Sequence, residues 1–125
     1  MSFPSPLPAV EPPLATIDLE AFALLREDLD PEDLAQVVAL YLDNLPSRVA
    51  GIREACDRRD GEALAGMAHS LKSASRQLGI LRFGAWCEKA ERAARAGALD
   101  LAAEWVLLLE REIATVRAAL QQAMA

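Results

Sequence analysis

Apolar residues recur every three or four positions along most of this 125-residue chain, the period of an amphipathic α-helix. The longest stripe runs from Leu34 to Cys56 and follows Asp30-Pro31, a pair typical of a helix start. Pro46 lies inside this stripe, and we expect it to kink one helix rather than to separate two. The remaining stripes predict a short helix at 18–28 capped by Asp18, a helix from Asp60-Gly61 to Gly79, a helix from Phe83 to Gly97, and a helix that begins at about Leu99 and includes Leu120.

The order of these elements predicts the fold. A chain of this length is one domain by size, its alanine-rich composition favours helix, and its β-branched residues do not cluster as strands require. We expect an all-α fold over residues 15–125: an antiparallel up-down-up-down four-helix bundle with the 18–28 helix across one end. Residues 1–14 hold five of the seven prolines, and we interpret them as a flexible, extended arm.

Charge and cysteine content narrow the possible functions. A net charge of −6 argues against general binding to nucleic acid or to anionic membranes. We find neither a signal peptide nor an apolar run long enough to span a membrane, and expect a cytoplasmic protein. Cys56 and Cys87 lie in apolar stripes without a metal-binding spacing, which indicates core residues in a reducing compartment.

The chain has one histidine, His69, on the polar side of its predicted helix. An incidental surface histidine is the ordinary interpretation of such a residue, and periodicity alone leaves it open. A core histidine is excluded, because the apolar stripe lies on the opposite side of the helix. That stripe consists of Leu64, Met67, Leu71, Ala74 and Leu78.

The residues around His69 favour a functional role for this histidine. Lys72 and Arg76 share its face, with Arg82 nearby, and form a small positive spot on an acidic protein. One turn before His69, Ala65 and Gly66 place almost no side chain beside it. Such an imidazole is suited to act as a nucleophile toward a large partner molecule.

One segment carries a family resemblance. His69-Ser70-Leu71-Lys72-Ser73-Ala74-Ser75-Arg76-Gln77-Leu78-Gly79 resembles the signature of histidine-containing phosphotransfer (HPt) domains, roughly H-x-L-K-G-S-[SA]-x-x-L-G. The similarity continues through Cys87-Glu88-Lys89-Ala90-Glu91, extends weakly to Leu42-Asp43-Asn44-Leu45-Pro46, and covers about residues 18–122. Ser73 departs from the family's usual glycine, and we expect it to narrow access to the histidine.

The resemblance implies that His69 accepts a phosphoryl group from an aspartyl phosphate of one response-regulator receiver domain and passes it to the aspartate of another. Lys72 is the first candidate to stabilise that group, and Arg76 the second. Glu91 returns alongside through the helical hairpin, where it either fixes the imidazole tautomer or forms a surface ion pair. The residues expected to line the docking surface are Ala65, Gly66, Ser73, Gln77 and Glu91.

The resemblance also implies that the receiver supplies Mg²⁺, so no cofactor or metal is expected in this chain. Without a glycine-rich phosphate loop, and with Ser70 rather than an acid after His69, we expect no ATP site and no autokinase activity. The predicted function is therefore a phosphocarrier, not an enzyme, acting as a monomer with receivers and a hybrid histidine kinase as partners.

Two other functions compete with this interpretation. A docking bundle that is not phosphorylated would bind a receiver or kinase and occupy it, and Ser73 is the only sequence feature that supports it. A metal-binding bundle needs Glu-x-x-His pairs on several helices, which a chain with one histidine lacks.

Overall fold

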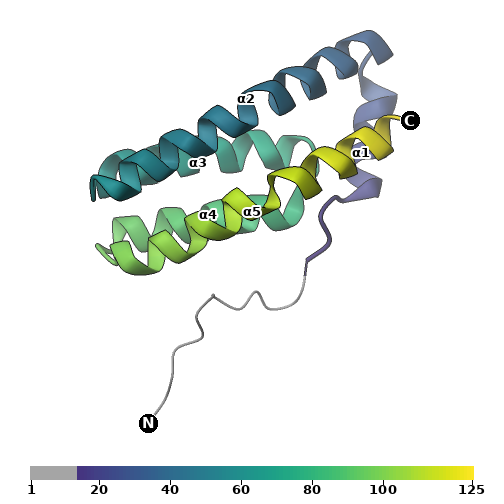
Figure 1. The fold of residues 1–125 in the computed structure, drawn as a ribbon. Coiled ribbons are helices and arrows are strands. Elements are labelled where there is room, and N and C mark those ends of the chain that lie inside the picture. The colour runs from purple at the N-terminus through teal and green to yellow at the C-terminus, as the bar shows by residue number, and fades with distance from the viewer. Residues whose placement is uncertain (1–13) are drawn as a thin grey trace.

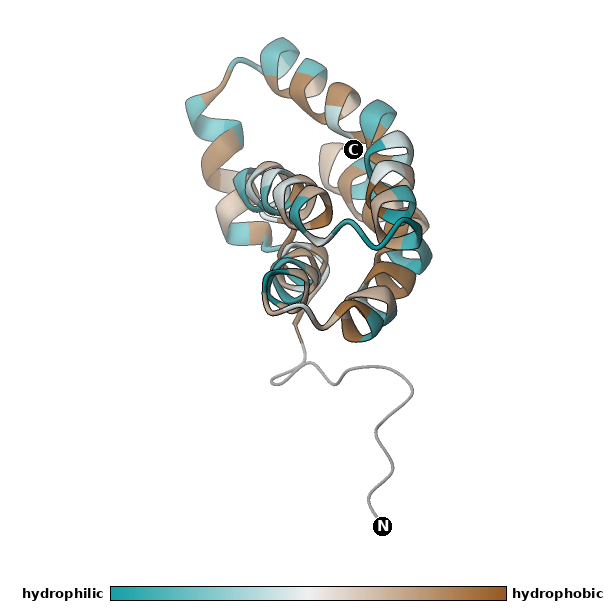
Figure 2. Ribbon diagram, turned by 90° about the vertical axis from the view of Figure 1, so that its left-hand side faces the viewer, coloured by the Kyte–Doolittle hydropathy of each residue, from teal (hydrophilic) through white to brown (hydrophobic). Residues whose placement is uncertain are grey.

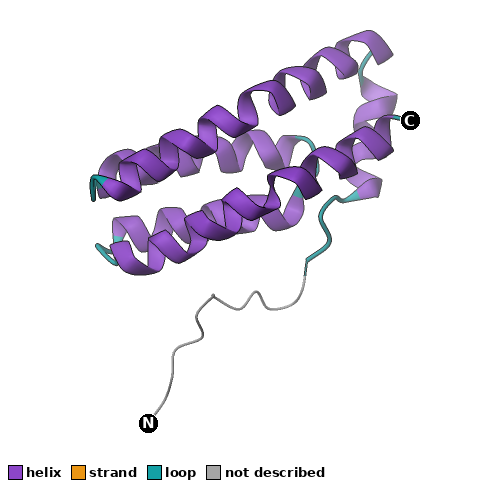
Figure 3. Ribbon diagram, viewed as in Figure 1, coloured by secondary structure: helices purple, strands orange, loops and turns teal. Residues whose placement is uncertain are grey.

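A computed structural model describes residues 14–125, and Figure 3 shows that this part of the chain is helical except for short connections. The expected arm of residues 1–14 lies, apart from Leu14, outside the described residues. No helix in the described part is long and apolar enough to cross a membrane. The helices are α1 (Leu19–Asp28), α2 (Pro31–Asp57), α3 (Gly61–Gln77), α4 (Leu81–Arg95) and α5 (Leu99–Met124).

The four long helices form a bundle. α2 packs against α3 and α5, and α4 packs against the same two helices, so the four follow one another around a common core. Short connections reverse the chain between successive helices, which makes the neighbours antiparallel. Figure 1 shows α1 lying across the end of the bundle where α2 begins and α5 ends. The predicted four-helix bundle with a short helix across one end is confirmed.

Caps and turns fix the helix boundaries. Aspartates precede three helices, and each carboxylate accepts a backbone N–H of the first turn, at 3.0 Å for Asp18, 3.4 Å for Asp30 and 3.1 Å for Asp60. Gly79 and Gly97 have positive φ angles of 75° and 76°. Because this backbone lies outside the helical region, α3 and α4 each end two residues before the glycine at which the sequence predicted their ends.

The apolar stripes meet inside the bundle, which Figure 2 views nearly along its length. α2 continues through Pro46 as one helix, as predicted. Cys56 and Cys87 are buried free thiols, and burial raises the pKa of Cys87 to about 12, so this thiol stays protonated. Both cysteines are therefore core residues. The largest fully buried side chains include Phe22, Leu45, Ile52, Leu64, Leu71, Phe83 and Leu109.

The segment before α1 is tied to the turn between α3 and α4. The Asp18 amide donates to the Gly79 carbonyl at 2.7 Å, and the guanidinium of Arg82 donates to Thr16 Oγ1 at 2.9 Å and to Glu112 at 2.6 Å. Grouping Arg82 with the cations near the histidine is therefore wrong. Its side chain is held in the first turn of α4 by partners on α5 and on the segment before α1.

A buried polar pair joins α2 to α3. Tyr41 Oη and Ser75 Oγ lie 2.8 Å apart, and Ser75 is fully buried. Burial raises the pKa of Tyr41 well above its ordinary value, although its hydrogen bond to Ser75 acts in the opposite direction. The phenol therefore stays protonated and the pair is neutral.

Replacing Tyr41→Phe removes the side-chain partner of the Ser75 hydroxyl inside the core. We expect the free energy of unfolding, measured by urea denaturation, to fall by about 1–2 kcal/mol. The double variant Tyr41→Phe/Ser75→Ala is the control, and it should recover part of the loss because no hydroxyl is then left unpaired. An unchanged free energy of unfolding in Tyr41→Phe would show that this hydrogen bond does not stabilise the fold.

Candidate functional site

The histidine lies on the outer surface of α3, the helix between α2 and α4. The side chain of His69 is 56% exposed, although the residue beside it, Ala68, is fully buried. The opposite side of α3 supplies Leu64 and Leu71 to the core. The apolar stripe thus fixes the rotation of α3, and this rotation presents the imidazole to solvent.

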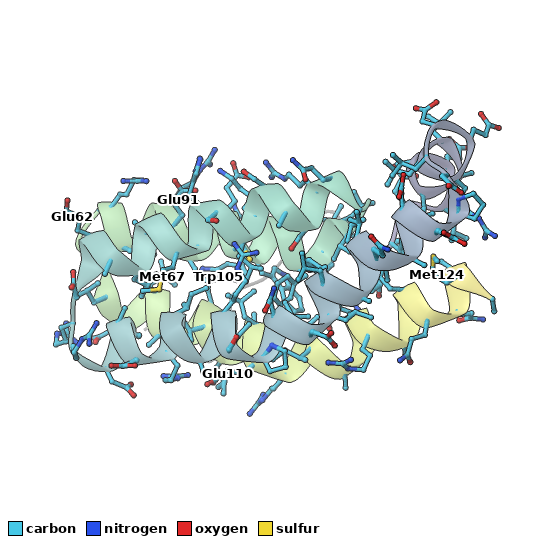
Figure 4. All side chains as sticks on the ribbon, turned by 90° about the horizontal axis from the view of Figure 1, so that it is seen from above. Glu62, Met67, Glu91, Trp105, Glu110 and Met124 are labelled. Atoms are coloured by element: carbon cyan, nitrogen blue, oxygen red, sulfur yellow. The ribbon has the colours of Figure 1, made fainter. Side chains whose placement is uncertain are left out.

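α4 brings a carboxylate to this imidazole. Glu91 is 8% exposed, and its Oε2 lies 3.0 Å from His69 Nδ1. The same carboxylate accepts from Lys72 Nζ at 2.9 Å and from Arg95 Nε at 3.1 Å. Figure 4 shows Glu91 at the edge of the bundle along which α3 and α4 run. Glu91 is therefore the shared acceptor of three side chains from two helices.

These contacts determine which ring nitrogen carries the proton. Burial raises the pKa of the Glu91 carboxyl, but hydrogen bonds from Lys72, Arg95 and His69 outweigh burial and hold the pKa below its ordinary value. An ionised carboxylate only accepts hydrogen bonds, so His69 Nδ1 must donate. When the imidazole is neutral, Nε2 therefore has a free lone pair. Of the two roles considered for Glu91, this geometry favours fixing the tautomer.

The cations near His69 are not all as exposed as their helical positions suggest. The Lys72 side chain is only 14% exposed, because it bends towards Glu91. Arg76 is 48% exposed and pairs with Glu88 on α4 at 2.9 Å. Both candidates for stabilising a phosphoryl group thus have a carboxylate partner on α4.

The small residues around His69 divide between two sides of α3. Gly66 and Ser73 are exposed, and a side chain built at Gly66 would meet open space. Gln77 is also exposed, at the end of the helix. Ala65, in contrast, is fully buried, so its predicted place on the accessible surface is wrong. It lies about 40° from His69 on the helical wheel, towards α4, where α4 covers it.

Sequence reasoning missed four residues near the site. Arg95 follows Glu91 by four residues, a spacing at which helical side chains meet, and this was the available signal. Arg48 on α2 donates to Ser70 Oγ at 2.7 Å, and no sequence pattern indicates that contact. Val37 and Leu40 are 45% and 64% exposed, apolar residues on the polar face of α2.

A groove of about 190 Å³ lies between α2 and α3 on the same side of α3 as Ser73. Val37 and Leu40 are its exposed apolar residues on α2, Ala74 and Gln77 lie on the α3 side, and the rest of the lining is Tyr41, Asn44, Arg48 and Leu78. No group of three or more His, Cys, Asp or Glu side chains within residues 14–125 is placed to hold a metal ion. The site therefore consists of an imidazole, its carboxylate partner, surrounding cations and an adjoining apolar groove.

Comparison with protein families finds a match to the Hpt domain over residues 36–119, about two thirds of the chain. Among solved structures, the chain is similar to the histidine-containing phosphotransfer protein B (HptB) of Pseudomonas aeruginosa PAO1. The two are 26% identical with a TM-score of 0.81, and the match covers 92% of this chain and 96% of that one. Comparison with curated proteins finds no match. These findings support a phosphocarrier of a phosphorelay rather than an enzyme with a catalytic site of its own, and the chain belongs to the Hpt domain family.

Proposed function

We propose that Nε2 of His69 accepts a phosphoryl group from the aspartyl phosphate of one receiver domain and passes it to the aspartate of a second receiver. The observation that carries this proposal is the hydrogen bond between His69 Nδ1 and the buried Glu91 carboxylate. This bond holds the proton on Nδ1 and leaves Nε2 as the free nitrogen of an exposed ring.

The transfer is a displacement at phosphorus. The Nε2 lone pair forms the N–P bond while the P–O bond to the aspartyl carboxyl oxygen breaks, and the carboxylate leaves with the bonding electrons. Nδ1 keeps its proton throughout, and the positive charge that the ring gains lies against Glu91. The reverse steps deliver the phosphoryl group to the second receiver.

The charges around the ring suit this chemistry. Glu91 carries one negative charge, and its partners Lys72 and Arg95 carry two positive ones, so the cluster attracts an anion. Glu88 is likewise paired with two cations, Arg76 and Arg92. A transferring phosphoryl group spreads charge over three oxygens and is stabilised by such an excess of cations. Mg²⁺ would be held by the receiver, not by this chain.

A receiver would approach from the α2 side of His69. Gly66 and Ser73 have little side-chain bulk to obstruct a partner on that side. The groove that Val37 and Leu40 help to line offers apolar surface for contact with the receiver. The α4 side is less open, because Lys72, Arg76 and their carboxylate partners stand there. A hybrid histidine kinase would reach the site through its own receiver domain.

Mixed with a phosphorylated receiver and Mg²⁺, the protein should acquire a phosphate that is labile to acid and stable to base, while His69→Gln should acquire none. The physical reason is that no other residue of the chain is a histidine. The measurement is radiolabel retained on the protein after acid or base treatment. Label retained by His69→Gln would contradict the assignment, and a wild-type protein that binds receivers without label would favour the docking bundle.

Bulk at position 73 should block docking without unfolding the bundle. Ser73 is exposed, so Ser73→Leu should leave the melting temperature nearly unchanged and reduce transfer from a receiver at least tenfold, about 1.4 kcal/mol of barrier. Thr115→Leu, an exposed position on α5 across the bundle from α3, is the matched control and should transfer normally. Transfer by Ser73→Leu at the wild-type rate would show that the receiver does not dock against the surface around position 73.

A further inference from the structure

We propose that Arg48 of α2, a cation with no carboxylate partner among the described residues, contacts the phosphoryl group carried on Nε2 of His69. This inference rests on the proposed function and adds a residue from a third helix to the site. In the structure without a phosphoryl group, the Arg48 guanidinium donates to Ser70 Oγ at 2.7 Å.

The orientation of the imidazole places Nε2 on the side of Arg48. Nδ1 faces α4, because it donates to Glu91 there. The two nitrogens of an imidazole point in nearly opposite directions, so Nε2 faces away from α4 and towards the side of α3 on which α2 packs. A phosphoryl group on Nε2 would therefore extend towards α2.

The position of Arg48 matches that direction. Ser70 follows His69 by about 100° around α3, on the α2 side, and Arg48 reaches across from α2 to meet it. Lys72 lies about 60° away in the opposite sense and is drawn to Glu91. Of these two cations, Arg48 thus borders the side of the ring on which Nε2 lies.

Arg48 also differs from the other cations of the site in its charge pairing. The other cations around the site each have a carboxylate partner: Glu91 for Lys72 and Arg95, and Glu88 for Arg76 and Arg92. Within the described residues, Arg48 has no such partner and bonds only to a neutral hydroxyl. Exchanging that hydroxyl for a phosphoryl oxygen would form a charge-assisted hydrogen bond without breaking an ion pair.

The surroundings of Arg48 leave it room to move. A hollow of about 240 Å³ adjoins its side chain and is bordered by Gly51, Met67 and Ser70. A guanidinium also presents a planar fork of N–H groups that binds two phosphoryl oxygens at once. Arg48 therefore has the charge, the shape and the space that contact with a phosphoryl group requires.

Labelling of His69 by phosphoramidate tests this contact without a receiver, so that docking plays no part. In this reaction the N–P bond of the donor breaks, ammonia leaves and the phosphoryl group forms a bond to Nε2. Arg48→Gln should slow labelling about tenfold, as expected for loss of one charge-assisted hydrogen bond. The labelling rate of Arg48→Lys should lie between those of the wild type and Arg48→Gln, because lysine keeps the positive charge but lacks the planar fork of N–H groups. The matched control is Arg111→Gln, an exposed arginine on α5, which should label at the wild-type rate.

A second measurement distinguishes direct contact between Arg48 and the phosphoryl group from a structural effect of the substitution. In ³¹P NMR, the last ionisation of the phosphoryl group on the wild-type protein should occur at lower pH than in Arg48→Gln, because a nearby cation favours the dianion. Ser70→Ala frees Arg48 without removing its charge, and should keep labelling within twofold of the wild type. Equal labelling rates, or equal ³¹P titrations, in the wild type and Arg48→Gln would overturn the role of Arg48. A wild-type protein that accepts phosphate from neither phosphoramidate nor a receiver would overturn the proposed function instead.

Discussion

The hydrogen bond between His69 Nδ1 and the Glu91 carboxylate is the interaction on which the site depends. It requires Glu91 to stay ionised although it is 8% exposed, and burial alone would favour the neutral acid. Lys72 and Arg95 supply the compensating hydrogen bonds. The ion cluster thus orients the imidazole, while the His69 side chain remains 56% exposed. The Glu91 carboxylate therefore both pairs with cations of α3 and α4 and orients the imidazole.

The bundle makes this arrangement possible because the partners come from different helices. α3 provides the imidazole and Lys72, and α4 provides Glu91 and Arg95, so their contact depends on how closely the two helices pack. The turn at Gly79 connects these two helices, and the segment before α1 bonds directly to it through Asp18. α2 completes the site from the other side with Arg48 and the apolar groove.

Periodicity predicted the parts of the structure that local sequence controls. The rotation of α3, its cap at Asp60 and the exposure of His69 all follow from an apolar stripe and a capping residue. Contacts between helices were harder to predict, because they depend on long, flexible side chains that choose among several partners. The bending of Lys72 towards Glu91 and the reach of Arg48 to Ser70 belong to this class. The prediction that Ala65 lies on the docking surface was wrong for a related reason. The periodicity of one helix does not indicate which of its sides a neighbouring helix covers.

The position of the proton on neutral His69 tests this account most directly. Long-range ¹H–¹⁵N correlation spectra at mildly alkaline pH distinguish the two ring nitrogens of a histidine in the folded protein. We expect the wild-type ring to be protonated at Nδ1 and unprotonated at Nε2, and Glu91→Ala to lose this preference. A wild-type ring with its proton on Nε2 would contradict the role proposed for Glu91, because Nε2 would then lack the lone pair that the proposed phosphoryl transfer requires.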